Sequence, residues 1–248
     1  MGGKMGNMRQ LLILLLCLTV VSCGSAQQNT PAATPLPQPT IPAVAEALES
    51  QPQDHVEVIG YLYPAAKGTS LVGGLSHSLG EMPAPLAEAG AIWLPDPPAL
   101  PANAAIDVAG SGGYPLVRVS GQLSPTGRYG PDNRYPRQIT EASLELLSVR
   151  DLSIALLLDN SGIYDNQPVH LSGQILLGAS TALLVDQLGS GGVPAARARQ
   201  IKLVGVIEGD SLRKRLTATS SGAAYFGPVQ IVGIWRRSSL YPLTIIPG

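Results

Sequence analysis

The chain has 248 residues, of which 13% are charged, and its formal net charge is −1. A net charge so close to zero excludes a strongly basic protein that binds nucleic acid through bulk electrostatics. No apolar run is longer than the roughly 18 residues of a short membrane-spanning helix, so an ordinary transmembrane segment is not expected. Gly (28) and Pro (22) are abundant, which is typical of many short strands joined by turns.

The N-terminal segment combines two positive charges with a short apolar run. Lys4 and Arg9 precede residues 11–21, a run of 11 residues in which only Thr19 is polar. The run is too short to cross about 30 Å of hydrocarbon as a helix, but it fits the core of a secretory signal peptide. The sequence therefore predicts export from the cytoplasm.

The apolar run ends in Val20, Val21, Ser22 and Cys23. This pattern of aliphatic residues, a small residue and a cysteine resembles the lipobox of bacterial lipoproteins. The resemblance implies that residues 1–22 are a lipoprotein signal peptide, that cleavage follows Ser22, and that Cys23 carries the lipid, with fatty acyl chains such as palmitate. Two or three acyl chains anchor a protein stably, so the resemblance implies a place on the extracytoplasmic face of a bacterial membrane. The alternative is an ordinary secretory signal that is cleaved after a small residue.

The segment after Cys23 has the composition of a tether. Residues 24–42 contain no charged side chain and five prolines, and such a composition cannot bury a core. We interpret residues 23–42 as a lipidated cysteine followed by an extended, proline-rich tether. The only other cysteine, Cys17, lies in the predicted signal peptide, so the mature chain is expected to have no disulfide and no cysteine metal site.

The rest of the chain contains one strand pattern four times, an alternation of apolar residues around a central glycine. The glycines are Gly60, Gly121, Gly173 and Gly233. A period of two predicts half-buried strands, and a fixed glycine within a strand predicts a bulge or sharp bend. The first and second glycines are 61 residues apart and the third and fourth 60 apart. This spacing predicts two copies of one unit, residues 43–150 and 151–248.

Further strands follow the same repeat and bring each unit to five. The second strands are residues 70–75 and 182–187, the third 91–95 and 200–204, and the last 143–147 and 241–246. A short helix is expected to lead into each unit, over residues 43–48 and 151–158, with Asp151 or Ser153 as the cap of the second. Residues 154–158 also fit a strand, because a short apolar run is ambiguous.

Five strands, a glycine-bent first strand and a long connection between the third and fourth strands resemble the OB-fold, a five-stranded barrel. The lead-in helix also resembles OB-like domains that are repeated in bacterial surface lipoproteins. The resemblance implies a mainly β protein with two tandem five-stranded OB-fold-like barrels. Residues 97–114 show no helix between the third and fourth strands, although residues 210–219 fit one helical turn. A β-sandwich or another small barrel is the alternative.

No residues form a recognisable catalytic or metal-binding pattern. His55, His77 and His170 lack the spacing of metal ligands, and we interpret them as surface or strand residues. The glycine-rich residues 110–113 and 189–192 lack the ending of a phosphate-binding loop and are interpreted as flexible loops. We therefore expect no enzyme activity, no cofactor and no metal.

One loop carries the residues of a candidate binding site. Residues 124–142 interleave arginines and tyrosines, as a platform that stacks on bases or sugars requires. The candidate ligand-binding residues are Arg128, Tyr129, Arg134, Tyr135 and Arg137. The matching loop of the second unit is only residues 236–239, so the first unit is the better candidate. The alternative is a solvated hairpin loop stiffened by prolines.

Charge is shared unevenly between the two units. Residues 23–150 sum to −5 and residues 151–248 to +2, so the second unit could meet anionic headgroups or wall polymers. Together these features predict a membrane-anchored, non-enzymatic binding or assembly module whose partner is an envelope protein or a cell-wall polymer. The alternative function is an oligosaccharide- or oligonucleotide-binding protein that uses residues 124–142. Nucleic acid is the less expected ligand, because aromatic residues are only 4% of the chain and the location is extracytoplasmic.

Overall fold

The computed structural model describes residues 41–65, 67–77, 82–99, 113–205, 207 and 209–248. The predicted signal peptide, Cys23 and the tether up to residue 40 lie outside these residues, as does most of the glycine-rich segment 110–113. Within the described part of the chain, no helix is both long and apolar enough to cross a membrane. The protein is mainly β, as the sequence predicts.

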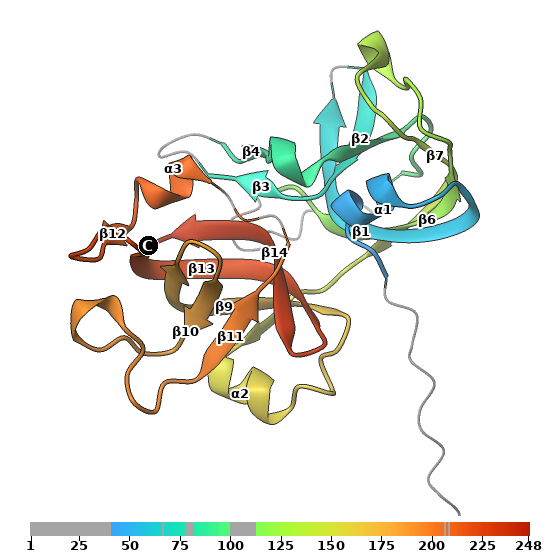
Figure 1. Ribbon diagram of the computed structural model, residues 1–248. Helices are drawn as coiled ribbons and strands as arrows, with labels where there is room; N and C mark the ends of the chain where they lie inside the picture. Colours follow the sequence, from blue (N-terminus) through green and yellow to red (C-terminus); the bar gives the residue numbers. More distant parts are fainter. Residues whose placement is uncertain (1–40, 66, 78–81, 100–112, 206, 208) are drawn as a thin grey trace, which may run out of the picture. The chain divides into compact units, whose positions relative to one another are not determined.

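The first half of the described chain, residues 43–150, contains a closed five-stranded barrel (Figure 1). Its elements are α1 (Val44–Glu49), β1 (Gln53–Ala65), β2 (Gly68–Val72), β5 (Ala91–Leu94), β6 (Leu116–Leu123) and β7 (Ile139–Leu146), with the short β3 (Leu75–Ser76), β4 (Ala84–Pro85), η1 (Ala87–Ala89) and η2 (Pro131–Asn133) between them. The sheet order is β5-β2-β1-β6-β7. A parallel bridge from Trp93 to Gln138 joins its two edges.

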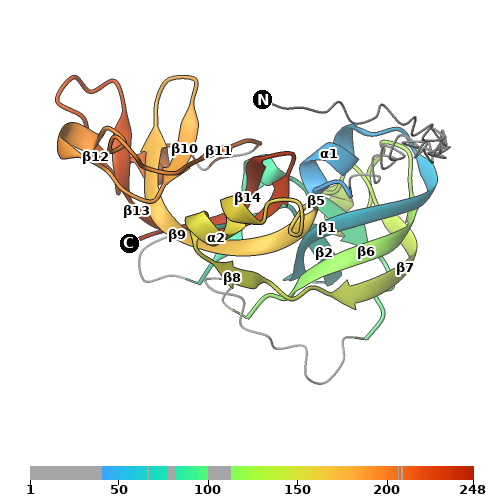
Figure 2. The ribbon, with the colours of Figure 1, turned by 90° about the horizontal axis from the view of Figure 1, so that it is seen from below.

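The second half, residues 151–248 with the strand that leads into it, forms a second sheet. Its elements are β8 (Arg150–Leu152), α2 (Ile154–Asp159), β9 (Gln167–Leu177), β10 (Ala182–Val185), η3 (Ser190–Gly192), β11 (Gln200–Leu203), α3 (Asp210–Arg213), β12 (Thr217–Ala218), β13 (Tyr225–Arg236) and β14 (Ser239–Pro247). The order is β12-β13-β9-β10-β11-β14-β3-β4, and β13 also pairs with β14. Figure 2 shows β8 and α2 beside the long β9. Because β3 and β4 belong to the first half, this sheet contains strands from both halves.

Both predicted lead-in helices are present, and the second is shorter than expected. The prediction of residues 43–48 is confirmed by α1 within one residue. In the second half the chain remains extended as β8 through Leu152, and the helix begins only at Ile154. The Ser153 side chain caps it by accepting a hydrogen bond from the Leu156 amide at 3.1 Å. Ser153 is therefore the cap rather than Asp151, which lies in β8.

The four predicted glycine strands are all present, and the glycines occupy crowded positions. A Cβ at Gly60 would lie 2.7 Å from the Val72 carbonyl oxygen, and one at Gly173 would lie 2.8 Å from the Val185 carbonyl oxygen. The pairing of β6 with β7 is irregular at Gly121, and that of β13 with β14 is irregular at Gly233. The glycines therefore allow close approach of a neighbouring strand or a bulge, as the sequence pattern predicts.

The predicted match between the second strands is wrong by one residue. Contacts at Gly60 and Gly173 show that Leu71 of the first half is equivalent to Leu184 of the second, whereas the sequence match made Leu71 equivalent to Leu183. The strands also end at Val72 and Val185, before the predicted ends. A slip of one residue is easily made from sequence, because the short apolar runs here do not alternate strictly.

Three apolar clusters hold the structure together. One fills the first half, one fills the second half, and the third lies between the two halves. The third cluster joins Ile59 and Tyr61 of β1 to Val232 and Ile234 of β13. All four of these side chains are fully buried. Each half therefore has a core of its own, and the two halves share the third apolar cluster, through which they pack against each other.

Candidate functional site

The predicted binding loop is an ordered hairpin that spans residues 124–138. Because β7 begins at Ile139, the last four residues of the predicted loop 124–142 belong to a strand. Tyr129 and Tyr135 form an antiparallel bridge in which each amide donates to the other residue's carbonyl, at 2.9 and 3.2 Å. The Gly127 amide donates to the Pro136 carbonyl at 2.9 Å. These bonds fix the loop as a narrow two-stranded extension of the barrel.

The two tyrosine rings of the loop pack against their own chain. The Tyr135 ring lies 5.2 Å from the indole of Trp93, measured between centroids. The Tyr129 hydroxyl donates to the Pro125 carbonyl at 3.0 Å, and its ring lies against Gly127. Gly130, at φ 67°, allows the chain to turn close to Trp93. Both rings therefore stabilise the loop, and both are half-buried.

The three arginines of the loop have different surroundings. Arg137 is only 4% exposed. Its guanidinium donates to the carbonyl oxygens of Ser50 and Leu48 at the end of α1, and to that of Ser124 at 2.6 Å. The last carbonyls of a helix lack partners within the helix, so Arg137 satisfies one end of α1. Arg128 and Arg134 are exposed, and Arg134 lies 3.9 Å from Asp132. The exposed cations of the loop are thus Arg128 and Arg134.

A second buried arginine holds the other end of α1. Arg236 is 2% exposed and comes from the second half. It donates to the Glu46 carboxylate at 2.8 Å and to the Ile41 carbonyl, and it lies 5.2 Å from the centroid of the Tyr241 ring. No local sequence pattern marks Arg137 or Arg236 as buried, because each finds its partners far away in the sequence.

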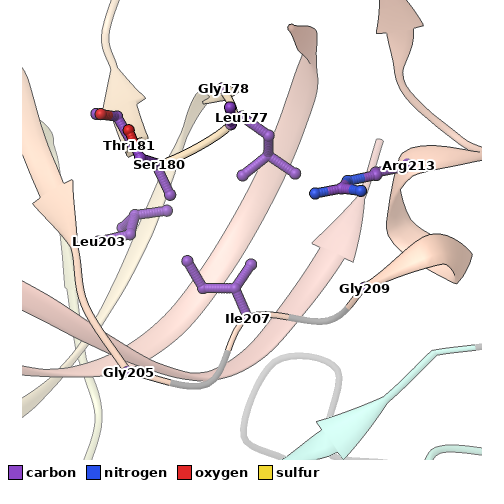
Figure 3. A pocket seen from close by; sticks show the side chains of 11 residues that line it. Leu177, Gly178, Ser180, Thr181, Leu203, Gly205, Ile207, Gly209 and Arg213 are labelled. Atoms are coloured by element: carbon purple, nitrogen blue, oxygen red, sulfur yellow. The ribbon is translucent and has the colours of Figure 1, made fainter.

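A cleft opens in the second half beside the turn between β9 and β10. Its volume is about 290 Å³. Figure 3 shows the apolar side chains of Leu177, Leu203 and Ile207 around it, with the Arg213 guanidinium at its other side. Arg213 also lies 5.9 Å from the Tyr225 ring centroid and 4.0 Å from an Asp210 carboxylate oxygen. The cleft offers an apolar wall and one cation.

The histidines and carboxylates of the described residues form no group of three that could hold a metal ion. His55 lies on β1, His77 follows β3 and His170 lies on β9. His170 has a neighbouring carboxylate, with Nδ1 at 3.2 Å from an Asp151 oxygen. The structure therefore places the three histidines on different elements.

Two tyrosines have shifted pKa values, and neither belongs to the loop. Burial raises the pKa of Tyr61, although a hydrogen bond from Thr244 partly opposes this. Partial burial raises the pKa of Tyr63, and the neighbouring Tyr114, 4.7 Å away between ring centroids, adds to the shift. Both shifts follow from packing, because the neutral phenol is favoured where water is excluded. They indicate structural tyrosines rather than a reactive pair.

Comparisons of the chain with protein-family models, with curated proteins and with solved structures gave no match.

Proposed function

We propose that this protein is a lipid-anchored, extracytoplasmic lipoprotein that acts as a non-enzymatic binding or assembly module. The lipobox-like residues ending in Cys23 carry this proposal, because they imply both an export signal and an anchor. Residues 24–40 separate that anchor from the body that begins near Ile41. The module presents its surfaces to an envelope protein or a cell-wall polymer near the membrane.

Each half of the body is proposed to be an OB-fold-like barrel. In the first half β1 pairs with β2, β2 with β5, and β6 with both β1 and β7. In the second half the pairing starts at β9, passes through β10, β11, β14 and β13, and returns to β9. The parallel contact falls between the third and fifth strands in both halves, and this order supports the proposal.

The shared core favours an assembly role for the pair of barrels. Tyr61 of the first half accepts a hydrogen bond from Thr244 of the second half at 3.0 Å, inside the third apolar cluster. A shared apolar cluster of this kind holds the two modules against each other, so a partner that contacts both is bound without ordering a linker.

The proposal is tested by capturing the tagged full chain from detergent-solubilised native membranes after cross-linking. Cys23→Ser runs beside the wild type, because it removes the proposed acylation site and leaves the body unchanged. We expect a stoichiometric envelope partner with the wild type and its loss or strong reduction with Cys23→Ser. Equal capture by both forms, or no partner with either, would contradict a membrane-localised assembly module.

The second candidate function is binding of an oligosaccharide or oligonucleotide through the loop, residues 124–138. Arg128 and Arg134 favour it, because both are exposed on a hairpin whose backbone is fixed. Arg128 and Arg134 directly precede Tyr129 and Tyr135, which pair with each other across the hairpin. Arg128→Gln with Arg134→Gln is the cleaner test than loss of Tyr129 or Tyr135, since those rings stabilise the loop itself. Unchanged glycan and DNA binding in this double variant would exclude the loop as the site.

A further inference from the structure

The first half contains a hollow that lies at the base of the loop rather than at its tip. Its volume is about 420 Å³, within the range of roughly 300–1,000 Å³ that is typical of small-ligand sites. It forms where β1 begins, where β6 ends and where β7 begins, and Figure 2 shows these three strands side by side. The residues used below are Pro52, Gln53, Asp54, Gln122, Pro125 and Thr140.

Two strand irregularities flank β6 at this hollow. The pairing of β1 with β6 passes from Gln53 and Leu123 to Val56 and Gly121, so β1 carries one extra residue. The pairing of β6 with β7 shifts at the same level, where Glu141 takes a positive φ of 52°. Bulges re-aim side chains and are common at the rims of barrels and beside binding sites. Here they turn polar side chains of both outer strands toward one place.

The second half lacks the corresponding irregularity in its first strand. The pairing of β9 with β13 is regular from Leu177 with Tyr225 to Gln167 with Trp235. The repeat therefore does not require the bulge in β1, and among the described strands this bulge is a feature of the first half.

The lining of the hollow combines uncommitted polar groups with apolar surface. Among the described residues, the side chains of Gln53, Asp54 and Thr140 have no hydrogen-bond partner. The Gln122 amide donates to the Glu141 carboxylate at 3.2 Å, which leaves its carbonyl oxygen as an acceptor. Pro52 and Pro125 add apolar surface. Amide, carboxylate and hydroxyl groups beside apolar surface suit a ligand with many hydroxyls and exposed C–H faces.

The charges at the hollow select against anions. Asp54 lines it, Glu141 contacts Gln122, and the described residues of its lining include no lysine or arginine. An anionic polymer would meet these carboxylates, and the nearby Arg137 is buried and already bonded to backbone carbonyls, whereas a neutral ligand meets no such repulsion. This separates the hollow from the tip of the loop, where Arg128 and Arg134 are exposed.

We propose that the hollow binds a neutral saccharide unit of an extracytoplasmic glycan. The glycan source rests on the proposed location of the protein outside the cytoplasm, whereas the ligand chemistry rests on the lining of the hollow. The hollow accepts one or two sugar rings, with hydroxyl groups bonded to Gln53, Gln122 and Thr140 and ring C–H groups against the two prolines.

The test uses the full chain in detergent and frontal affinity chromatography on immobilised chitotetraose and cellotetraose, with dextran sulfate as the anionic comparison. We expect retention on a neutral column with a dissociation constant in the range of about 0.1–10 mM. Gln53→Ala with Thr140→Ala removes two hydrogen-bonding groups and lowers this affinity about tenfold. The matched control is Gln200→Ala with Thr217→Ala, which changes the same residue types on exposed strand positions of the second half, and its affinity stays within about twofold.

Three results would overturn the proposal. One is the absence of retention on both neutral columns by the wild type, and another is an equal loss in the control pair. The third is retention on dextran sulfate alone that Arg128→Gln abolishes, because this would assign binding to the tip of the loop. None of these results depends on acylation of Cys23, so failure here is distinguishable from failure of the proposed anchored location.

Discussion

The hydroxyl of Tyr61 joins the two halves of the protein, and its removal tests how tightly they are coupled. Thr244 donates a hydrogen bond to it at 3.0 Å. Tyr61 is fully buried and Thr244 is 1% exposed. Tyr61→Phe therefore leaves the Thr244 hydroxyl buried without its acceptor, which lowers the free energy of unfolding by about 1–3 kcal/mol. The aromatic ring remains, so lost packing contributes little.

The assay uses the two tryptophans of the chain as separate reporters. Trp93 lies in β5 of the first half and Trp235 in β13 of the second half, and both are buried. In a Trp93→Phe background the fluorescence of Trp235 follows the second half during guanidinium unfolding. In a Trp235→Phe background the fluorescence of Trp93 follows the first half. We expect Tyr61→Phe to lower both midpoints equally without changing the slope of the transition. Equal shifts follow because the third apolar cluster makes the halves unfold together.

Thr244→Val completes a double-mutant cycle for this bond. Its single effect should resemble that of Tyr61→Phe, and the double variant should lose about 1 kcal/mol less than the sum of the two. Additive losses would refute the argument that the two hydroxyls interact. A midpoint shift confined to one tryptophan reporter would refute the coupling of the halves.

Three further predictions concern other contacts. Gly60→Ala places a Cβ 2.7 Å from the Val72 carbonyl oxygen, so we expect urea unfolding to show a free energy of unfolding lower by about 1–3 kcal/mol. The control is Gly162→Ala, whose Cβ meets nothing within 4 Å and should change that free energy by less than about 0.5 kcal/mol. Arg137→Met leaves the carbonyls of Ser50 and Ser124 without their donor and should cost about 2–3 kcal/mol; an effect no larger than that of the exposed Arg128→Met would contradict its role in holding α1. Because burial raises the pKa of Tyr61 above its ordinary value of 10.0, its contribution to stability is intact below that pH and falls above it by about 1.4 kcal/mol per pH unit. Urea unfolding between about pH 9 and 11 should show a smaller loss for Tyr61→Phe than for the wild type, because Tyr63, whose pKa burial also raises, still contributes a shift; parallel pH profiles would contradict the role of Tyr61.

Local patterns predicted the parts of the fold that depend on neighbouring residues. Alternating apolar residues predicted the strands around Gly60 and Gly173, because a period of two is set by the strand itself. The crowding at these glycines explains their fixed place within the strands. The pattern failed at β8, since Arg150, Asp151 and Leu152 contain no alternation that separates a strand from the start of a helix.

Long-range contacts explain what the sequence did not predict. Pairing of β3 with β14 brings Leu75 beside Thr244, and nothing near Leu75 in the sequence indicates this partner. Long-range contacts also explain why Arg137 is buried whereas Arg128 and Arg134, arginines of the same loop, are exposed. The acceptors of Arg137 at Leu48 and Ser50 lie 89 and 87 residues away, so its burial depends on how α1 folds back onto the barrel.

The candidate site also depends on contacts between residues that are far apart in the sequence. The sequence placed its candidate ligand-binding residues in the loop of the first half, whereas the hollow of about 420 Å³ lies at the base of that loop and none of those candidates is among its described lining residues. The residues that line it, among them Gln53 and Thr140, come from β1 and β7 as well as β6. Bulges bring these strands to one place, and a bulge depends on the register of two strands rather than on one pattern.

The most direct test of the central claim is mass spectrometry of the N-terminal peptide after expression in a bacterium that processes lipoproteins. The account predicts that the mature chain begins at Cys23 and that this residue carries a diacylglyceryl group, while Cys23→Ser carries none and is not cleaved after residue 22. A mature chain with unmodified Cys23, or one cleaved elsewhere, would contradict the proposal that the protein is a lipid-anchored module.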